Sequence, residues 1–260
     1  MHWLRRRALL SREDIARYSR QLLLSEINEE GQQNLADAHV VIIGLGGLGC
    51  LAAHYLVGAG VGSQAGSITL VDGDTVEISN LQRQIAYNEM HLGELKANAL
   101  QGELSKVNAA VNLNVKCLFA DSKNLAAMMA QATCVLDCTD NIMTRKQINA
   151  ACVKNHVPLF IAAASGCSWQ AINIAGKPQN SGCYACLVEQ MSIPETCMTK
   201  GILGPVVGMA ACHQATQVLM YLANAQNPNI QWGKYLVSDA VKATMQSFHL
   251  PPSPQCEICQ

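Results

Sequence analysis

The sequence predicts an α/β fold in which a mostly parallel sheet is covered by helices and is followed by antiparallel C-terminal strands. Short apolar runs of strand length alternate with segments of helical length between residues 39 and 164. This alternation is typical of right-handed crossovers between parallel strands. After Gly166 the alternation stops, and extended segments surround one long helical stretch.

Each element of the first part has its own signal. Apolar residues at helical spacing over 12–35, interrupted by Gly31, predict a pair of short helices. The run His39–Ile43 ends at Gly44 and has the continuous apolar character of a strand buried on both faces. The further elements expected here are a helix over 48–58, a strand over 67–71, an amphipathic helix over 96–107, strands over 111–118 and 134–137, a helix over 144–155 and a strand over 159–164.

The second part is expected to hold strands over 170–174 and 235–237 and an extended segment over 242–249. They enclose a Gly- and Pro-rich connection and a helix that begins at Pro205 and runs to residue 223. Because no Pro/Ser-rich linker separates the two parts, one continuous domain over 1–260 is expected.

Composition excludes several classes of protein as first choices. Only 14% of the 260 residues are charged, well below the roughly 25% of an average soluble domain, so the chain is expected to be globular. A net charge of -1 provides no field for nucleic acid or for an anionic membrane. His213, Gln214 and Gln217 interrupt the apolar helix over 205–223, which therefore indicates a buried helix rather than a membrane span. No export signal is recognised, so a cytoplasmic location is expected and the twelve cysteines are expected to be thiols, metal ligands or catalytic groups.

A glycine-rich turn, Gly44-Leu-Gly-Gly-Leu-Gly49, lies between the first expected strand and a helix. Glycines let a backbone turn tightly and approach a nucleotide, and a helix N-terminus presents free N–H groups to negative charge, as in Rossmann-like folds. Asp72 closes the next strand, where a carboxylate can bind ribose hydroxyls. The turn indicates a nucleotide but does not separate NAD from ATP, and a tight turn without any ligand is the alternative.

The segment after the second strand favours a triphosphate. It carries Asp72, Asp74, Asn80, Arg83 and Gln84, and Lys96 follows it. Arginine and lysine offset the charge of a triphosphate and of a departing pyrophosphate, whereas a dinucleotide does not require this group of side chains.

These residues, together with Arg17-Tyr-Ser-Arg-Gln21 and Asp137-Cys-Thr-Asp-Asn141, resemble the ThiF/MoeB family of bacterial adenylating enzymes, relatives of the ubiquitin-activating enzymes. The resemblance extends from about residue 17 to residue 259. It implies a Rossmann-like domain with N-terminal helices at about 12–35, a nucleotide-binding half at about 36–165 and a carrier-binding and zinc half at about 166–260.

The resemblance also implies roles for single residues. Asp72 would bind the ATP ribose, and Asp140 would bind Mg²⁺ near the α-phosphate, although Asp140 could instead be a helix N-cap. Arg20 would reach into the nucleotide site of a second subunit in a homodimer, although on sequence alone it is a solvated helix charge. The residues expected to bind ATP are Gly44, Gly46, Gly49, Asp72, Asp74, Asn80, Arg83, Gln84, Lys96 and Asp140, and those expected to carry catalysis are Arg20, Arg83, Lys96, Asp140 and Cys197.

Two C-x-x-C pairs, Cys183/Cys186 and Cys256/Cys259, offer four thiolates. Four thiolates suit a closed, structural Zn²⁺ site, and redox-active pairs are the alternative. Family members place zinc at the matching positions. Cys197 matches a cysteine that can bond the activated carrier in sulfur-transferring relatives, with an incidental thiol as the alternative. We expect Cys50, Cys134, Cys138 and Cys152, which lie on predicted core elements, to be inert, and His213 to be a core histidine.

The expected reaction is ATP- and Mg²⁺-dependent adenylation of the C-terminal glycine of a ubiquitin-like sulfur-carrier protein, with release of pyrophosphate. The expected carrier ends in Gly-Gly and is ThiS-like, for thiamine thiazole synthesis, with a sulfurtransferase or cysteine desulfurase as sulfur donor. The alternatives are MoeB-like activation of the small subunit of molybdopterin synthase, adenylation of a peptide or other carboxylate, an NAD-dependent oxidoreductase and a non-catalytic scaffold. The peptide alternative is motivated by Trp169, where relatives usually carry glycine and where a bulky ring could reshape the groove for the carrier's tail.

Overall fold

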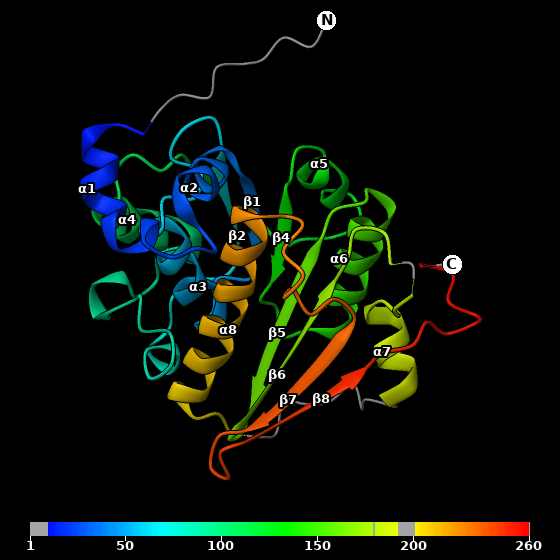
Figure 1. Ribbon diagram of the computed structural model, residues 1–260. Helices are drawn as coiled ribbons and strands as arrows, with labels where there is room; N and C mark the ends of the chain where they lie inside the picture. Colours follow the sequence, from blue (N-terminus) through cyan, green and yellow to red (C-terminus); the bar gives the residue numbers. More distant parts are fainter. Residues whose placement is uncertain (1–9, 179, 192–200, 260) are drawn as a thin grey trace, which may run out of the picture.

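One eight-stranded sheet lies at the centre of the computed structural model, which describes residues 10–178, 180–191 and 201–259. The strand order is β3-β2-β1-β4-β5-β6-β7-β8 (Figure 1). The strands β3-β2-β1-β4-β5 pair in parallel, and β5 to β8 pair antiparallel. The parallel strands are β1 (His39–Ile43), β2 (Ser67–Val71), β3 (Leu113–Lys116), β4 (Cys134–Asp137) and β5 (Leu159–Ser165).

Helices cover both faces of the parallel part (Figure 1). One apolar core joins alternate residues of β1, such as Ile42, to α3 (Gly47–Gly58), α4 (Lys96–Val107) and α8 (Gly204–Ala223). A second core joins the other residues of β1, such as Ile43, to α5 (Leu125–Met129), α6 (Ile142–Lys154) and α7 (Tyr184–Met191). The central strands are therefore apolar on both faces, which explains why β1 and β4 appear in the sequence as unbroken apolar runs.

The antiparallel part extends the same sheet. It consists of β6 (Ser168–Ile174), β7 (Lys234–Asp239) and β8 (Thr244–His249). β8 is the edge strand, and all six of its residues are exposed.

The two N-terminal helices, α1 (Arg12–Leu22) and α2 (Asn28–Asp37), lie at the end of the molecule opposite the carboxyl edge of the parallel strands (Figure 1). Arg17 donates to the carbonyl of Val107 at the end of α4 (3.2 Å), and the hydroxyl of Tyr18 accepts from Asn108 (2.9 Å). The helices α3 and α4 begin at the carboxyl edge and end beside α1. With a rise of 1.5 Å per residue, the 12 residues of α3 place α1 about 18 Å from the glycine-rich turn.

The predicted fold class is confirmed, with shifts of one to three residues at the ends of several elements. The strand expected over 111–118 is shorter, and β6 and β7 are longer than expected. The sequence analysis did not identify α5, α7 or the 3₁₀ turns Ile78–Asn80 and Glu89–His91. No helix of the described residues is long and apolar enough to cross a membrane.

Candidate nucleotide-binding site and four-cysteine cluster

The glycine-rich turn connects β1 to α3 at the carboxyl edge of the sheet. Gly44 has a φ of +87°, and a Cβ atom there would lie 2.9 Å from the carbonyl carbon of Cys138. A Cβ at Gly49 would lie 1.9 Å from the carbonyl oxygen of Gly44. Only glycine fits these two positions, and the turn leaves the first N–H groups of α3 free to meet an anion.

Asp72 follows β2 and lies beside this turn. Its carboxylate accepts hydrogen bonds from the backbone N–H of Leu45 (2.6 Å) and of Asp74 (2.8 Å). Burial raises the pKa of Asp72, with the two backbone hydrogen bonds and Lys96 acting in the opposite direction. The carboxylate therefore holds the glycine-rich turn against the end of β2.

The connection from β2 to α4 brings the predicted cationic side chains to the same edge. Lys96, the first residue of α4, is buried and its Nζ lies 3.2 Å from Oδ2 of Asp74. Arg83 donates to the carbonyl of Ser79 (2.9 Å), and its own carbonyl oxygen would be 3.0 Å from a Cβ at Gly47. The residues 79–84 thus lie against the glycine-rich turn.

Asn80 and Gln84 are both buried in this connection. The side-chain oxygen of Asn80 accepts from the backbone N–H of Glu77 (3.2 Å), so Asn80 shapes the 3₁₀ turn. The amide nitrogen of Gln84 would be 3.6 Å from a Cβ at Gly46. Its side-chain oxygen is buried and has no hydrogen-bond partner among the described residues. Buried acceptors are usually satisfied, so this oxygen fits a site that a ligand completes.

The segment after β4 lies on the other side of the turn. Asp137 is fully buried, and one of its carboxylate oxygens accepts from the N–H (2.9 Å) and the hydroxyl (2.7 Å) of Thr139. Burial raises the pKa of Asp137, although Arg145 and the bonds from Thr139 act against this shift. Asp140 is exposed, and the side chain that caps α6 is Asn141, which accepts from the N–H of Thr144 (3.0 Å). Asp140 is therefore not the helix cap, and its hard oxygen ligands fit Mg²⁺.

Three predicted features lie elsewhere. Arg20 is exposed on α1, the helix at the far end of α3, and so it does not join the site of its own chain. Cys197 lies outside the described residues. Trp169 packs against His213 of α8, with ring centroids 5.1 Å apart, so it faces away from the surface of the sheet that carries Gln170.

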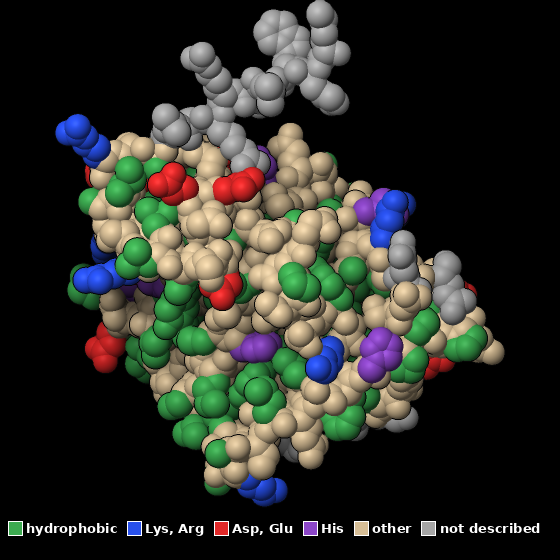
Figure 2. Space-filling model, viewed as in Figure 1, with side chains coloured by type: hydrophobic (Ala, Val, Ile, Leu, Met, Phe, Trp, Pro, Cys, Tyr) green, Lys and Arg blue, Asp and Glu red, His purple; other side chains and the backbone are tan. Residues whose placement is uncertain are grey.

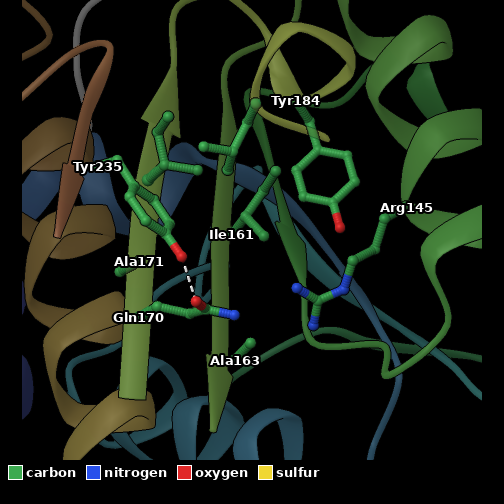
Figure 3. Close-up of a pocket in the computed structure, with 9 residues that line it drawn as sticks. Arg145, Ile161, Ala163, Gln170, Ala171, Tyr184 and Tyr235 are labelled. Carbon is green, nitrogen blue, oxygen red and sulfur yellow. Dashed lines mark hydrogen bonds between the residues drawn. The ribbon is translucent and has the colours of Figure 1, made fainter. Parts of the chain in front are cut away.

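A small hollow lies on that opposite surface, between the antiparallel strands and α7 (Figure 3). The hydroxyl of Tyr235 donates to the side-chain oxygen of Gln170, and Tyr184 points toward the guanidinium of Arg145. Burial raises the pKa of Tyr235 to about 12, so its hydroxyl stays protonated. The residues that line the hollow are Arg145, Ile161, Ala163, Gln170, Ala171, Ile172, Tyr184, Leu187 and Tyr235.

The four cysteines of the two C-x-x-C pairs come together as predicted. Their sulfur atoms all lie within 4.8 Å of one another. Four sulfurs around Zn²⁺ at about 2.3 Å would be about 3.8 Å apart, and the distances Cys183–Cys256 (3.7 Å) and Cys186–Cys259 (3.6 Å) agree with this spacing. The cluster joins the start of α7 to the C-terminal segment.

Two N–H donors surround this cluster. Asn149 of α6 donates to the sulfur of Cys183 (3.3 Å), and the backbone N–H of Ser253 donates to that of Cys186 (3.3 Å). Such outer hydrogen bonds stabilise metal-bound thiolates. The donor set therefore fits a closed zinc site better than a pair of redox centres, and the cluster could hold one structural Zn²⁺.

The remaining cysteines on core elements are buried, as predicted. Burial raises the pKa of Cys50 to about 11, and it also raises that of Cys134, Cys138 and Cys152. His213 is partly buried, and desolvation lowers its pKa.

Sequence reasoning assigned no role to Gln214 or Arg145, two buried polar residues near the carboxyl edge. In the sequence, Gln214 stands out only as an interruption of the apolar helix. A polar amide at the centre of an otherwise apolar helix could have indicated a structural role for Gln214, because a buried amide requires hydrogen-bond partners.

The strand order 3-2-1-4-5, with a glycine-rich turn at the point where that order reverses, is typical of nucleotide-binding α/β proteins. The sequence model of the ThiF family matches residues 18–258, and the chain belongs to the ThiF family.

Named relatives agree with this family. The chain is 40% identical to the sulfur carrier protein ThiS adenylyltransferase of Escherichia coli K12, over 95% of each chain. It is 36% identical to the molybdopterin-synthase adenylyltransferase of Salmonella typhimurium, over 97% of this chain and 99% of that one. Among solved structures, E. coli MccB with ATP superimposes with a TM-score of 0.78 at 25% identity, covering 94% of this chain and 74% of that chain.

Proposed function

We propose that the protein adenylates the C-terminal carboxylate of a ThiS-like, ubiquitin-like sulfur-carrier protein. The observation that carries the proposal is the buried Lys96, paired with Asp74 at the carboxyl edge that also holds the glycine-rich turn and the residues 79–84 packed against it. Two relatives of nearly equal length, both named adenylyltransferases, support the same reaction.

In the proposed reaction a carboxylate oxygen of the carrier attacks the α-phosphorus of ATP. The new C(O)–O–P bond forms while the bond from the α-phosphorus to the bridging oxygen breaks, and pyrophosphate leaves with the electron pair. No side chain needs to act as nucleophile, so the protein contributes positioning and charge. A thin Gly-Gly tail suits this chemistry because it can approach a phosphate held close to the backbone.

The residues divide this work. Arg83 and Lys96 offset the charge of the triphosphate, and Gly44, Gly46 and Gly49 let the nucleotide approach the backbone. Asp72, Asp74, Asn80 and Gln84 position the turn and the nucleotide. Asp140 would hold Mg²⁺, which supplies charge stabilisation at the phosphates. Cys197 remains a proposed sulfur-transfer residue, with a sulfurtransferase or cysteine desulfurase as the sulfur source.

We also propose that the single unit 1–260 divides into a nucleotide-binding half at about 36–165 and a carrier-binding and zinc half at about 166–260. The β5–β6 hairpin supports a single unit, because it joins the two halves within one sheet. A zinc ion on the cysteine cluster would fasten the C-terminal segment to α7.

A cytoplasmic location also remains a prediction.

The proposed homodimer finds support in an apolar surface. On α3 and α8, Tyr55 is 49% exposed and Met209 is 45% exposed. Figure 2 shows hydrophobic side chains gathered over α8 on this face, with few charged ones. A shallow hollow there is lined by Tyr55, Cys212, Ala215, Thr216 and Leu219. Exposed apolar surface of this kind is typical of an interface between subunits.

The proposed role of Arg20 depends on the dimer. Because α1 lies at the far end of α3, Arg20 can serve a nucleotide site only in another copy of the chain. Mixing Arg20→Ala chains with Lys96→Ala chains should therefore restore part of the activity that each variant lacks. If mixed dimers form and no activity returns, Arg20 does not act across the interface.

Carrier-dependent exchange of radiolabelled pyrophosphate into ATP tests the proposed reaction. A ThiS-like protein ending in Gly-Gly should support exchange, and a carrier lacking the last glycine should not. Exchange with the small subunit of molybdopterin synthase alone would favour the MoeB-like activity, which a relative of 36% identity also supports. Exchange with none of the carriers or peptides would contradict the proposal.

Adenylation of a peptide has less support than adenylation of a carrier. The bulky ring of Trp169 motivates it, but this residue is buried under α8 and does not line the hollow beside Gln170. The names of the relatives favour neither an NAD-dependent oxidoreductase nor a non-catalytic scaffold.

A further inference from the structure

The gap between β4 and β5 is a feature that the proposed function does not explain. The pairing of these two strands ends at Asp137 and Ile161, although β5 continues to Ser165. Beyond that point the backbone carbonyls of the two segments need hydrogen-bond donors from elsewhere in the chain, because buried carbonyls are rarely left unpaired.

Gln214 bonds the last paired residues of the two strands, from the face of the sheet that α8 covers. Its side-chain nitrogen donates to the carbonyls of Phe160 (2.8 Å) and Asp137 (3.1 Å), and its oxygen accepts from the thiol of Cys138 (3.2 Å). The side chain is 1% exposed. The orientation of the amide follows from chemistry, since carbonyl oxygens can only accept and the nitrogen must face them.

Arg145 closes the gap from the opposite face. It extends from α6, and its guanidinium donates to the carbonyls of Thr139 (3.0 Å) and Ala162 (3.1 Å). Two buried side chains from opposite faces therefore bind the segment 137–139 to β5: Gln214 at the last paired residues, and Arg145 just beyond them.

This segment lies next to the nucleotide site. The backbone of Cys138 is the group that a Cβ at Gly44 would meet at 2.9 Å, and Asp140 is the second residue after it. A side chain that fixes the position of Cys138 thus also fixes the backbone against which the glycine-rich turn packs, and it fixes the position of Asp140.

We infer that Gln214 is a positioning residue that holds the segment 137–140 against β5 and thereby places the carboxylate of Asp140 for Mg²⁺·ATP. The inference rests on the proposed function, since it requires that this edge binds ATP. Gln214 itself does not touch the nucleotide in this account.

The experiment measures ATP binding by isothermal titration calorimetry, once with MgCl₂ and once with EDTA, for the full chain and for Gln214→Met. Methionine keeps the length of the side chain but removes all three hydrogen bonds. The wild-type chain should bind ATP more tightly with Mg²⁺. Because a contact made by a charged group typically contributes about tenfold or more to affinity, the ratio of affinities with and without Mg²⁺ should fall by about tenfold or more in the variant. Its affinity in EDTA should stay close to that of the wild-type chain.

Gln217→Met is the matched control. Gln217 lies on the same helix, and its side-chain oxygen accepts from Asn173 (2.9 Å) rather than from the segment after β4. The control should retain the Mg²⁺-dependent gain. If Gln214→Met does not fold by circular dichroism, Gln214→Glu replaces it, because its protonated form keeps one donor and one acceptor; it should show a smaller but measurable loss of the gain.

If Gln214→Met loses affinity for ATP equally with and without Mg²⁺, Gln214 supports only the fold. If the variant gains as much affinity from Mg²⁺ as the wild-type chain does and loses none in EDTA, Gln214 does not position Asp140. Either result overturns the inference while leaving the proposed function intact. If the wild-type chain binds no ATP under either condition, the proposed function itself fails.

Discussion

Replacing Lys96 by methionine separates the charge of this residue from its packing. The side chain of Lys96 is 8% exposed and that of its partner Asp74 is 57% exposed. Because solvent screens the pair on the side of Asp74, we expect the loss of the ion pair to change the free energy of unfolding by less than about 1 kcal/mol. Methionine also retains a buried apolar stem.

The effect on ATP binding should be much larger. A hydrogen bond from a charged group contributes about 1.5–3 kcal/mol, which corresponds to an affinity roughly 10- to 150-fold weaker in Lys96→Met. Titration calorimetry with ATP and MgCl₂ measures this directly, and thermal unfolding checks that the variant is folded.

Lys106→Met is the control, because Lys106 lies on the same helix with a side chain that is 71% exposed and paired with Glu103. It should bind ATP as the wild-type chain does. If Lys96→Met is folded and binds ATP within about twofold of the wild-type affinity, Lys96 does not contact the triphosphate and the site has been placed wrongly.

Further predictions concern the metal, the glycine-rich turn and the buried carboxyl. Elemental analysis should find about one Zn²⁺ per chain, and Cys256→Ser should lose both the zinc and thermal stability. Cys117→Ser, which changes an exposed cysteine outside the cluster, should keep the zinc. Freshly purified wild-type protein that contains no zinc would contradict this prediction. Gly44→Ala should lower the melting temperature more than Gly93→Ala, because both have positive φ (+87° and +83°) but only Gly44 has a backbone neighbour within 3 Å of the added Cβ; equal losses would mean that backbone strain alone matters. Burial raises the pKa of Asp137 in the folded state, so its contribution to stability is present at low pH and is lost as the pH rises from the unfolded-state pKa through the folded-state pKa. Asp137→Asn does not titrate and should therefore gain in melting temperature relative to wild type as the pH rises through that interval; a difference that is constant with pH would show that the carboxyl does not titrate as argued.

The parallel part of the fold was predictable because its strands are buried on both faces. An unbroken apolar run such as His39–Ile43, followed by glycines and a helix, is typical of a central strand in a parallel sheet. The short α5 and α7 were not recognised. The five residues of α5 are too few to show a helical period, and α7 begins within a C-x-x-C pair whose cysteines were assigned to a metal.

The candidate site was predictable where its residues are consecutive in the sequence and less so where they meet through tertiary contacts. The sequence left two roles open for Asp140, a ligand of Mg²⁺ and the N-cap of a helix. The structure excludes the second, because Asn141 is the N-cap of α6. The partner of Gln214 lies 77 residues away at Asp137, and no local pattern indicates that contact. Similarly, the alternation of side chains along β6 decides which face Trp169 occupies, and a shift of one residue would have reversed it.

Intact-mass spectrometry of the carrier tests the central claim most directly. A purified ThiS-like protein ending in Gly-Gly would be incubated with the full chain, ATP, MgCl₂ and inorganic pyrophosphatase. We predict a carrier species heavier by one adenylyl group, located by fragmentation at the C-terminal glycine, and its absence when Lys96→Met replaces the wild-type chain. An unmodified ThiS-like carrier in the presence of wild-type protein that binds ATP would contradict the account.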